Sequence, residues 1–454
     1  MGASIQNRMT EGRIIPQLIK FALPLLVANF LQQFYALVDM LVVGRFVGST
    51  GLSAVTIGQN VSFILTFVCT GLTVGGQVLI AQYVGANDEK GKSQVIGTLM
   101  TMCVVGAFIM GAFTLAIYKT VLVWMDVPTE AMKDAQEYTF VSILGVFFIF
   151  GYNAICAILR GMGDSKRPML IIGIASVCNI LLDLLFVGPL KMGAMGAALA
   201  TIISQGVSCV IAAVYLYNRR ESFGFDFKLQ SFRPNAAKLR AILKIGVPTA
   251  IEMVIVNLSF MFVVKLINAY GVSATAAYGV GEKVCGILRI MASAVGTAAC
   301  TIEGQTMGAN NPKRVEKVVW SSLLIGCTLN LIGMVIVMLW PAQIFGLFDK
   351  DPETIKFGIG YIHVVGWGFL GYSYMNTFNG LARAVGNAVL VMIGSILDGF
   401  VLRLGLAYIL GTVAGLGLNG VYLGLTLAPY GAGFVAMLYF LSGRWKKRML
   451  VENA

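Results

Sequence analysis

The sequence predicts an all-α polytopic membrane protein with twelve transmembrane helices. Hydrophobic residues make up 57% of the 454-residue chain and charged residues only 12%, about half the charged fraction of a soluble domain. The mean hydropathy is +0.82. Charges are absent from long stretches such as 46–87, 318–348 and 404–443. Because a helix needs only about 20 apolar residues to cross a bilayer, each stretch holds at least one span.

Twelve segments are long and apolar enough to cross. Clusters of charged residues, Gly or Pro separate them, and such clusters favour connections over helix interiors. In chain order the expected spans are residues 14–43, 52–79, 94–120, 136–159, 167–188, 193–217, 241–264, 275–300, 316–340, 356–380, 388–411 and 418–442.

The positions of Lys and Arg predict the orientation of these spans. The two termini and every second connection hold 23 of these residues, and the other connections hold only 7. Because basic residues concentrate on the cytoplasmic side, we expect both termini there, in a plasma or inner membrane. The net charge of +12 is then explained by the basic residues on the cytoplasmic side of the membrane. We therefore expect the protein to associate with the lipid bilayer and not with nucleic acid.

The two halves of the chain are repeats of one six-span unit. Matches at an offset of 223 positions extend over more than a hundred residues, a strong sign of duplication. They include Gly85-Ala86-Asn87 with Gly308-Ala309-Asn310, and Asn153 and Arg160 with Asn376 and Arg383. We expect an N-terminal lobe at 1–217, a cytoplasmic linker at 218–240 and a C-terminal lobe at 241–454. Six spans is an even number, so the lobes are parallel and related by a pseudo-two-fold axis along the membrane normal.

The first span contains one acid, Asp39. An ionised carboxylate in hydrocarbon is expensive, so an acid within a span is a functional candidate. Gln32, Tyr35 and Asp39 are spaced at i, i+3 and i+7 and share one helix face. Pro24, and Pro248 in the second half, remove a backbone N–H and predict hinges. The alternative is an acid that reaches water from a helix end, but the polar face continues inward from Asp39.

A second acid, Asp183, lies in the fifth span, on one face with Ser176 and Asn179. The sixth span offers Thr201, Ser204, Gln205 and Ser208, and the fourth offers Asn153. We expect these spans and the first to enclose one polar pocket with two carboxyl groups. A low dielectric and a second nearby acid disfavour ionisation, which allows proton binding near neutral pH. The same oxygens could hold Na⁺, or the polar groups could serve only helix association.

The second half lacks an acid at the position of Asp39, where Val263 or its neighbour lies. Glu252, one turn past Pro248, is a secondary candidate acid. Tyr372, Asn376, Asn379 and Arg383 share a helix face that is expected to line a cavity. Internal ion pairs are expected among Glu282, Lys283 and Arg289, with a structural role as plausible as a functional one.

Enzyme chemistry and cofactor binding are not expected. No GxxxxGK[ST] motif occurs, which argues against ATP as the energy source. No nucleophile–base set is recognisable. The single His363 cannot form a metal site alone, and the eight Cys contain no CxxC pair. We therefore expect no catalytic residue, no metal site and no cofactor.

Taken in this order, the motifs resemble the multidrug and toxic compound extrusion (MATE) family. The resemblance rests on Pro24 and Asp39, on the two Gly-Ala-Asn loops, on Arg160-Gly161-Met162-Gly163-Asp164 with Pro168, and on Asn179 with Asp183. It implies cation-coupled antiport of drug-like, often cationic and amphipathic, molecules out of the cytoplasm through a central cavity between two lobes. By resemblance, the cation network comprises Asp39, Asn153, Asn179, Asp183 and Thr201.

The same resemblance places Gln32 at the substrate, and Tyr35, Gln205 and Asn376 are further predicted contacts. One branch of the family also uses acids in spans seven and ten. Glu252 could supply the first, but no acid lies between Lys356 and Arg383. The expected coupling ion is therefore H⁺ rather than Na⁺, and we expect a monomer.

The mechanism expected from these residues is a proton-driven switch. Protonation of Asp39 changes its hydrogen bonds to the fifth span, and the first span rebends at Pro24. A lipid-linked saccharide flippase of the same superfamily is the alternative, and it requires a wide basic cavity for pyrophosphate. The acidic charges inside the first half favour cationic cargo instead. A channel or receptor is a second alternative, which a flux measurement would distinguish.

Overall fold

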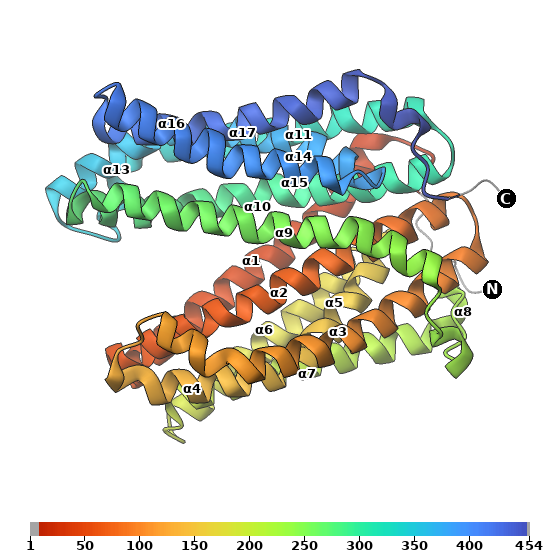
Figure 1. Ribbon diagram of the computed structural model, residues 1–454, viewed down its shortest axis with the longest axis horizontal. Coiled ribbons are helices and arrows are strands. Elements are labelled where there is room, and N and C mark those ends of the chain that lie inside the picture. Colours follow the sequence, from red (N-terminus) through yellow and green to blue (C-terminus); the bar gives the residue numbers. More distant parts are fainter. Residues whose placement is uncertain (1–8, 452–454) are drawn as a thin grey trace. The chain divides into compact units, whose positions relative to one another are not determined.

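The computed structural model describes residues 9–451, apart from the side chain of Ser49, and contains no strand among them (Figure 1). The longer helices are α1 (Ile14–Phe46), α2 (Gly48–Gly85), α3 (Glu89–Trp124), α4 (Thr129–Leu144), α5 (Val146–Gly161), α6 (Lys166–Val187), α7 (Gly193–Asn218), α9 (Ala236–Asn268), α10 (Val272–Gly308), α11 (Pro312–Leu339), α13 (Pro352–Val365), α14 (Gly368–Ala384), α15 (Ala388–Ile396) and α17 (Gly417–Leu441). Shorter elements are α8 (Arg220–Phe223), a 3₁₀ turn at Leu229–Phe232, α12 (Pro341–Gly346), α16 (Gly405–Tyr408), π-helical segments at Leu397–Leu404 and Ile409–Val413, and a 3₁₀ turn at Arg444–Lys447.

The predicted all-α polytopic membrane fold is confirmed. Among the described residues, ten helices are long and apolar enough to cross a membrane, and α4 with α5 forms an eleventh span with a bend of 45°. The remaining expected span, 356–380, is divided into α13 and α14 around Gly366 and Trp367. Gly145 and Gly368 are counterparts at the 223-residue offset, so both repeats interrupt their fourth span at about the same place.

Several helices extend further than their apolar segments predict. The second reaches Gly85, and the third begins at Glu89 because Asp88 caps it by accepting a 2.8 Å hydrogen bond from the backbone N–H of Gly91. Asn87 and Asn310 follow the helix ends with φ of 57° and 55°. These are left-handed conformations, which Asn tolerates better than most residues.

The chain divides into two compact units. Unit 1 comprises Val27–Ala250, and unit 2 comprises Met9–Leu26 together with the residues from Ile251 onward. The division falls inside α1 and α9, two residues after Pro24 and Pro248 respectively. Both helices continue through their prolines, so the hinge role stays a prediction.

The segment 218–240 packs against α3 of unit 1. The backbone N–H of Asn235 donates to Thr98 Oγ1 at 3.0 Å, and Thr101 Oγ1 donates to the carbonyl of Phe232 at 2.6 Å. This segment is therefore held by specific hydrogen bonds and is more than a flexible tether.

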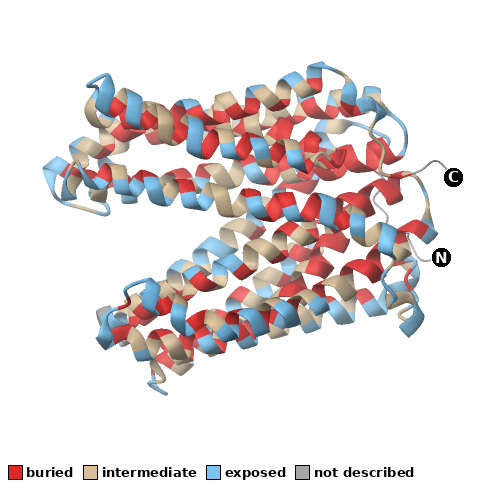
Figure 2. Ribbon diagram, viewed as in Figure 1, coloured by how far each residue is buried: buried red, intermediate tan, exposed pale blue. Residues whose placement is uncertain are grey.

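Exposed residues recur along the helices (Figure 2), and many of them are large and apolar. Leu41 is 72% exposed, Ile109 62% and Met261 69%. A soluble monomer rarely exposes so much apolar surface, whereas lipid chains solvate such residues readily. The exposed apolar surface and the hydropathy of the helices thus both indicate a multi-pass membrane protein.

Candidate functional site

Asp39 lies at the meeting point of α1, α2 and α4 within unit 1. Its side chain is only 3% exposed. Its Oδ2 accepts a 3.1 Å hydrogen bond from Gln59 Nε2 of α2, and its Oδ1 has no hydrogen-bond partner in the described part of the chain. Gln59 also interacts with the hydroxyl of Tyr138 of α4. Gly58 allows Tyr138 to lie next to Gln59, because a Cβ at residue 58 would overlap the ring of Tyr138.

Asp183 of α6 is completely buried. Neither of its carboxyl oxygens has a hydrogen-bond partner among residues 9–451, and the same holds for both side-chain polar atoms of Asn179 one turn earlier. Asp183 lies close enough to Asp39 to interact with it electrostatically. No described Lys or Arg forms an ion pair with either acid. Buried polar groups normally have partners, so this cluster is suited to receive a proton or a cation.

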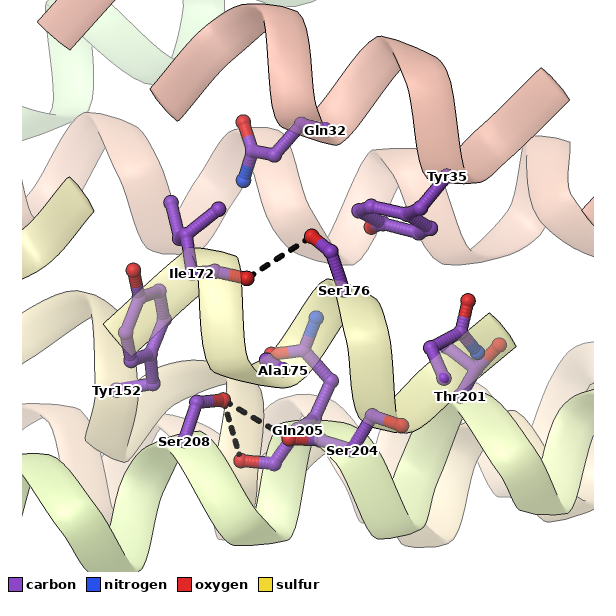
Figure 3. A pocket seen from close by; sticks show the side chains of 11 residues that line it. Gln32, Tyr35, Tyr152, Ile172, Ala175, Ser176, Thr201, Ser204, Gln205 and Ser208 are labelled. Carbon is purple, nitrogen blue, oxygen red and sulfur yellow. Dashed lines mark hydrogen bonds between the residues drawn. The ribbon is translucent and has the colours of Figure 1, made fainter. Parts of the chain in front are cut away.

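A pocket opens beside the two acids (Figure 3). Gln32 and Tyr35 reach into it from α1, and Gln205 reaches in from α7 on the opposite side. Its other lining residues are Tyr152 of α5, Ile172, Ala175, Ser176 and Asn179 of α6, and Thr201, Ser204 and Ser208 of α7. The unoccupied space in and around this pocket, open solvent included, is about 350 Å³. Only a small part of it is wide enough for water, so a drug-sized ligand requires the helices to separate.

The serine hydroxyls of this pocket donate to their own helices. Ser176 Oγ donates to the carbonyl of Ile172 at 2.9 Å, and Ser204 Oγ to the carbonyl of Ala200 at 2.7 Å. Ser208 makes the same kind of bond, to the carbonyl of Ser204. Their oxygens can therefore only accept further hydrogen bonds. The three serines thus offer acceptor oxygens, whereas the hydroxyl of Tyr152, which has no partner in the described structure, can also donate.

The structure brings together most of the predicted site residues of the first half. Gln32, Tyr35, Asn179, Thr201 and Gln205 all line the pocket. Tyr35 also lies within electrostatic range of both Asp39 and Asp183, and so links the pocket to the acids.

Three predicted residues lie elsewhere. Asn153 does not line the pocket, and its Nδ2 donates to the carbonyl of Ile149 at 2.8 Å. Its counterpart Asn376, in unit 2, bonds its own helix in the same way. Glu252 is not a free acid, because it forms an ion pair with Arg383 of α14.

Sequence reasoning missed Gln59, Tyr138 and Tyr152. It also expected Asp39 to bond to the fifth span, whereas its partner in the described structure is Gln59 of α2. A glutamine in the charge-free stretch 46–87 was an available signal. The pairing itself required knowing which helices are neighbours.

Unit 2 pairs three of its acids, Glu252, Glu282 and Asp398, with arginines. Glu282 Oε2 accepts a 2.8 Å hydrogen bond from Arg289, and Glu282 Oε1 accepts one of 2.8 Å from the hydroxyl of Tyr361. The predicted ion pair of Glu282 with Arg289 is therefore confirmed, but Lys283 takes no part in it. Asp398 and Arg403, both 1% exposed, form another pair.

Within the described part of unit 2, Glu303 is an exception. It is completely buried in α10, and neither of its carboxyl oxygens has a hydrogen-bond partner. No ion pair of the described chain includes it.

Comparison with known proteins shows the family. The MatE family model matches residues 24–185 and again 248–409, which is most of the chain and both repeats. A probable multidrug resistance protein of Bacillus subtilis (strain 168), YoeA, is 30% identical over 449 residues, covering 95% of this chain and 94% of that protein. A second from the same strain, YpnP, is 27% identical over 443 residues, covering 97% and 98%.

The fold is also that of solved transporters. An outward-facing multidrug resistance MATE family transporter of the MOP superfamily matches with a TM-score of 0.92 and 24% identity, over 99% of this chain and 100% of that one. A MOP superfamily transporter from Pyrococcus furiosus, described as having a binding pocket of reverse polarity, matches with a TM-score of 0.91 and 24% identity, over 98% and 99%. The chain thus belongs to the MatE family of multi-pass membrane transporters, as its sequence motifs indicate.

Proposed function

We propose that the protein is a secondary active multidrug exporter. It antiports organic, often cationic and amphipathic, compounds against H⁺ by alternating access, with both termini in the cytoplasm. The names of its curated relatives support drug export. The observation that supports ion coupling is the enclosure of Asp39 and Asp183 in one unit without a basic partner among the described residues.

The coupling follows from the electrostatics of two adjacent buried carboxyl groups. Such a pair resists double ionisation and titrates as one coupled system. A proton and an organic cation both relieve its negative charge, so each weakens binding of the other. Export then requires only that the two ligands differ in their preference for the inward-open and outward-open conformations.

The link between protonation and movement runs through Gln59 in this proposal. Its amide donates to Asp39, and a charged acceptor makes such a bond stronger than a neutral one. Protonation weakens the link between α1 and α2. The first helix then rebends near Pro24, where the carbonyl of Lys20 lacks its usual backbone donor.

The test is dye export from liposomes that contain the purified protein, with pH and Na⁺ gradients imposed separately. A pH gradient should drive export, and Asp39→Asn and Asp183→Asn should each lower the driven rate on the order of tenfold or more. Glu130→Gln is the control, because that acid is exposed at the start of α4. Export by Asp39→Asn at the wild-type rate, or dependence on Na⁺ alone, would contradict proton coupling.

A further inference from the structure

A polar groove lies where the segment 218–240 crosses the start of α3 in unit 1. The residues that line it include Lys90, Ser93 and Gln94 of α3, and Gln230, Ser231 and Arg233 of the segment. The unoccupied space in and around the groove, open solvent included, is about 1060 Å³. None of its lining residues lines the pocket beside Asp39 and Asp183, so the groove is a separate site.

Two glycines bring the segment directly onto α3. A Cβ at Gly97 would lie 1.9 Å from the carbonyl oxygen of Ser231, and a Cβ at Gly224 would lie 2.6 Å from Oε2 of Glu89. Gly224 also has a φ of 64°, a left-handed conformation that Gly adopts without strain. The two hydrogen bonds described above hold the same segment to α3. Backbone packing therefore fixes both walls of the groove.

The groove carries an excess of positive charge. Lys90 lines it from α3 and Arg233 from the segment, and both side chains are exposed. Neither takes part in an ion pair within residues 9–451. The acid that lines the groove, Glu89, already pairs with the buried Lys92. An ammonium and a guanidinium without counter-ions are suited to bind the oxygens of a phosphate group.

The second repeat supplies an acid at the equivalent place. At the 223-residue offset Ser93 corresponds to Glu316 of α11. The chain that follows α17 returns to this position, where Lys446 forms a 2.5 Å ion pair with Glu316 beside the completely buried Trp445. In unit 1 the hydroxyl of Ser93 replaces that carboxylate. The cations of the groove can therefore be neutralised only by an anion from outside the described chain.

The groove lies near the surface of the membrane. Glu89 is the first residue of the span α3, and Asn235 directly precedes the span α9. On α9 the exposed apolar side chains begin with Leu243 and continue with Val247. Leu243 is eight residues beyond Asn235, which is about 12 Å along a helix. Long Lys and Arg side chains near helix ends reach the membrane interface, so lipid headgroups are within reach of the groove.

An exposed leucine favours a lipid over a soluble phosphate compound. Leu229 is 88% exposed and directly precedes Gln230 of the groove. Beside a bound headgroup its side chain can enter the apolar part of the membrane interface, where its burial is favourable. A soluble phosphate compound provides no such environment for it.

We propose that this groove binds the phosphate of an anionic phospholipid. Lys90 and Arg233 hold the phosphate oxygens, the side-chain amides of Gln94 and Gln230 donate to the rest of the headgroup, and Leu229 lies beside the acyl chains. The bound lipid joins the start of α3 to the segment that leads into α9. The site does not depend on the proposed export function.

The test measures lipid binding to the full-length protein in detergent micelles by native mass spectrometry. The probes are phosphatidylglycerol and phosphatidylcholine with the same acyl chains, and the wild type should bind phosphatidylglycerol more tightly. Lys90→Gln together with Arg233→Gln should lower this affinity about thirtyfold, because each basic residue near an anionic headgroup contributes about fivefold. The matched control is Lys313→Gln together with Lys317→Gln, which removes two exposed cations at the start of α11 and should leave the affinity unchanged.

Two results would overturn the site itself. One is equal affinity of the wild type for the two lipids, and the other is an equal loss of phosphatidylglycerol binding in the groove variant and in the control. Leu229→Ser and competition by glycerol 3-phosphate test the assignment to a lipid. Leu229→Ser should weaken phosphatidylglycerol binding, and glycerol 3-phosphate at the concentration of the lipid should not displace it. Displacement at equal concentration, with no effect of Leu229→Ser, would show a site for soluble phosphates and overturn the lipid assignment.

Discussion

The two units build one arrangement of side chains with opposite electrostatics. In unit 1, Gly58 admits the ring of Tyr138, which lies against Gln59, and the neutral amide of Gln59 bonds to the acid Asp39. This acid has no cationic partner in the described structure.

In unit 2, the counterparts at the 223-residue offset are Gly281, Tyr361 and Glu282. Gly281 again admits the tyrosine ring, but the bridging residue is now an acid, and its partner is Arg289. The same offset places Phe262 opposite Asp39, next to the buried Val263, so no acid stands at this position.

The difference indicates which acids are able to bind a proton or Na⁺. An acid already paired with arginine has little to gain from a proton or Na⁺, and removal of either partner leaves an uncompensated charge. An acid without a counter-ion gains directly from binding one. On the proposed account the adjacent acids Asp39 and Asp183 of unit 1 bind the coupling ion, and the ion pairs of unit 2 stabilise its fold. Glu303 of unit 2 is also unpaired in the described structure, but it has no second acid beside it that shares its site.

The largest expected effect is a loss of stability when the most deeply buried ion pair of unit 2 is broken. Arg403→Leu leaves Asp398 charged and removes a 2.8 Å hydrogen bond to Ser259, which should cost about 3–5 kcal/mol of unfolding free energy. Asp398→Leu together with Arg403→Leu should recover most of this loss. Equilibrium unfolding in mixed micelles measures both.

The matched change in unit 1 is Asp183→Asn. It removes no ion pair of the described structure, so the unfolding free energy should change by less than about 1 kcal/mol. If Asp183→Asn destabilises the protein as much as Arg403→Leu does, the two units do not differ in the way described.

A smaller effect is expected at the bridging residue. Gln59→Leu leaves Asp39 without its hydrogen-bond partner and should lower pH-driven export of a cationic dye by about fivefold to tenfold. At the counterpart position, Glu282→Gln should lower stability and leave the pH dependence of that export in place. Loss of pH dependence in Glu282→Gln would move the coupling site to unit 2.

The smallest effect concerns the start of α13, outside the spans. Asp351 accepts hydrogen bonds from the hydroxyl and the backbone N–H of Thr354, and these bonds lower the pKa of its carboxyl group. Its counterpart Pro128 provides no side-chain cap for α4.

A lowered pKa stabilises the folded state above the unfolded value of about 3.9, and the gain is lost as the pH falls through the lower folded value. Below about pH 4, the protection of the Glu353 and Thr354 backbone N–H groups, relative to their intrinsic hydrogen-exchange rates, should therefore fall, and an Asp351→Asn variant should lack this pH dependence of protection. Equal changes at the start of α4 would show that the cap is not the cause.

The sequence predicts the features of this comparison that depend on local spacing. The positions of Gln32, Tyr35 and Asp39 on one face follow from helical periodicity, and all three lie where the pocket and its acids meet. The left-handed backbone conformation of Asn87 and Asn310 is likewise a local feature, because Asn adopts it more readily than most residues.

Features that depend on contacts between distant segments could not be predicted in this way. Glu252 forms an ion pair with Arg383, which lies 131 positions away in the sequence. An acid that has no basic partner near it in the sequence is therefore paired in the folded structure. Asn153 and Asn376 satisfy their amides on their own helices, which short polar side chains often do. Spacing alone does not distinguish that use from a ligand contact.

Proton release on substrate binding tests the central claim most directly. Purified protein in weakly buffered detergent solution is mixed with an organic cation, and a pH-sensitive dye records the protons released. The account predicts release by the wild type and by Glu282→Gln, and none by the Asp39→Asn, Asp183→Asn double variant. Equal release by the double variant and the wild type would contradict the assignment of the coupling ion to these two acids.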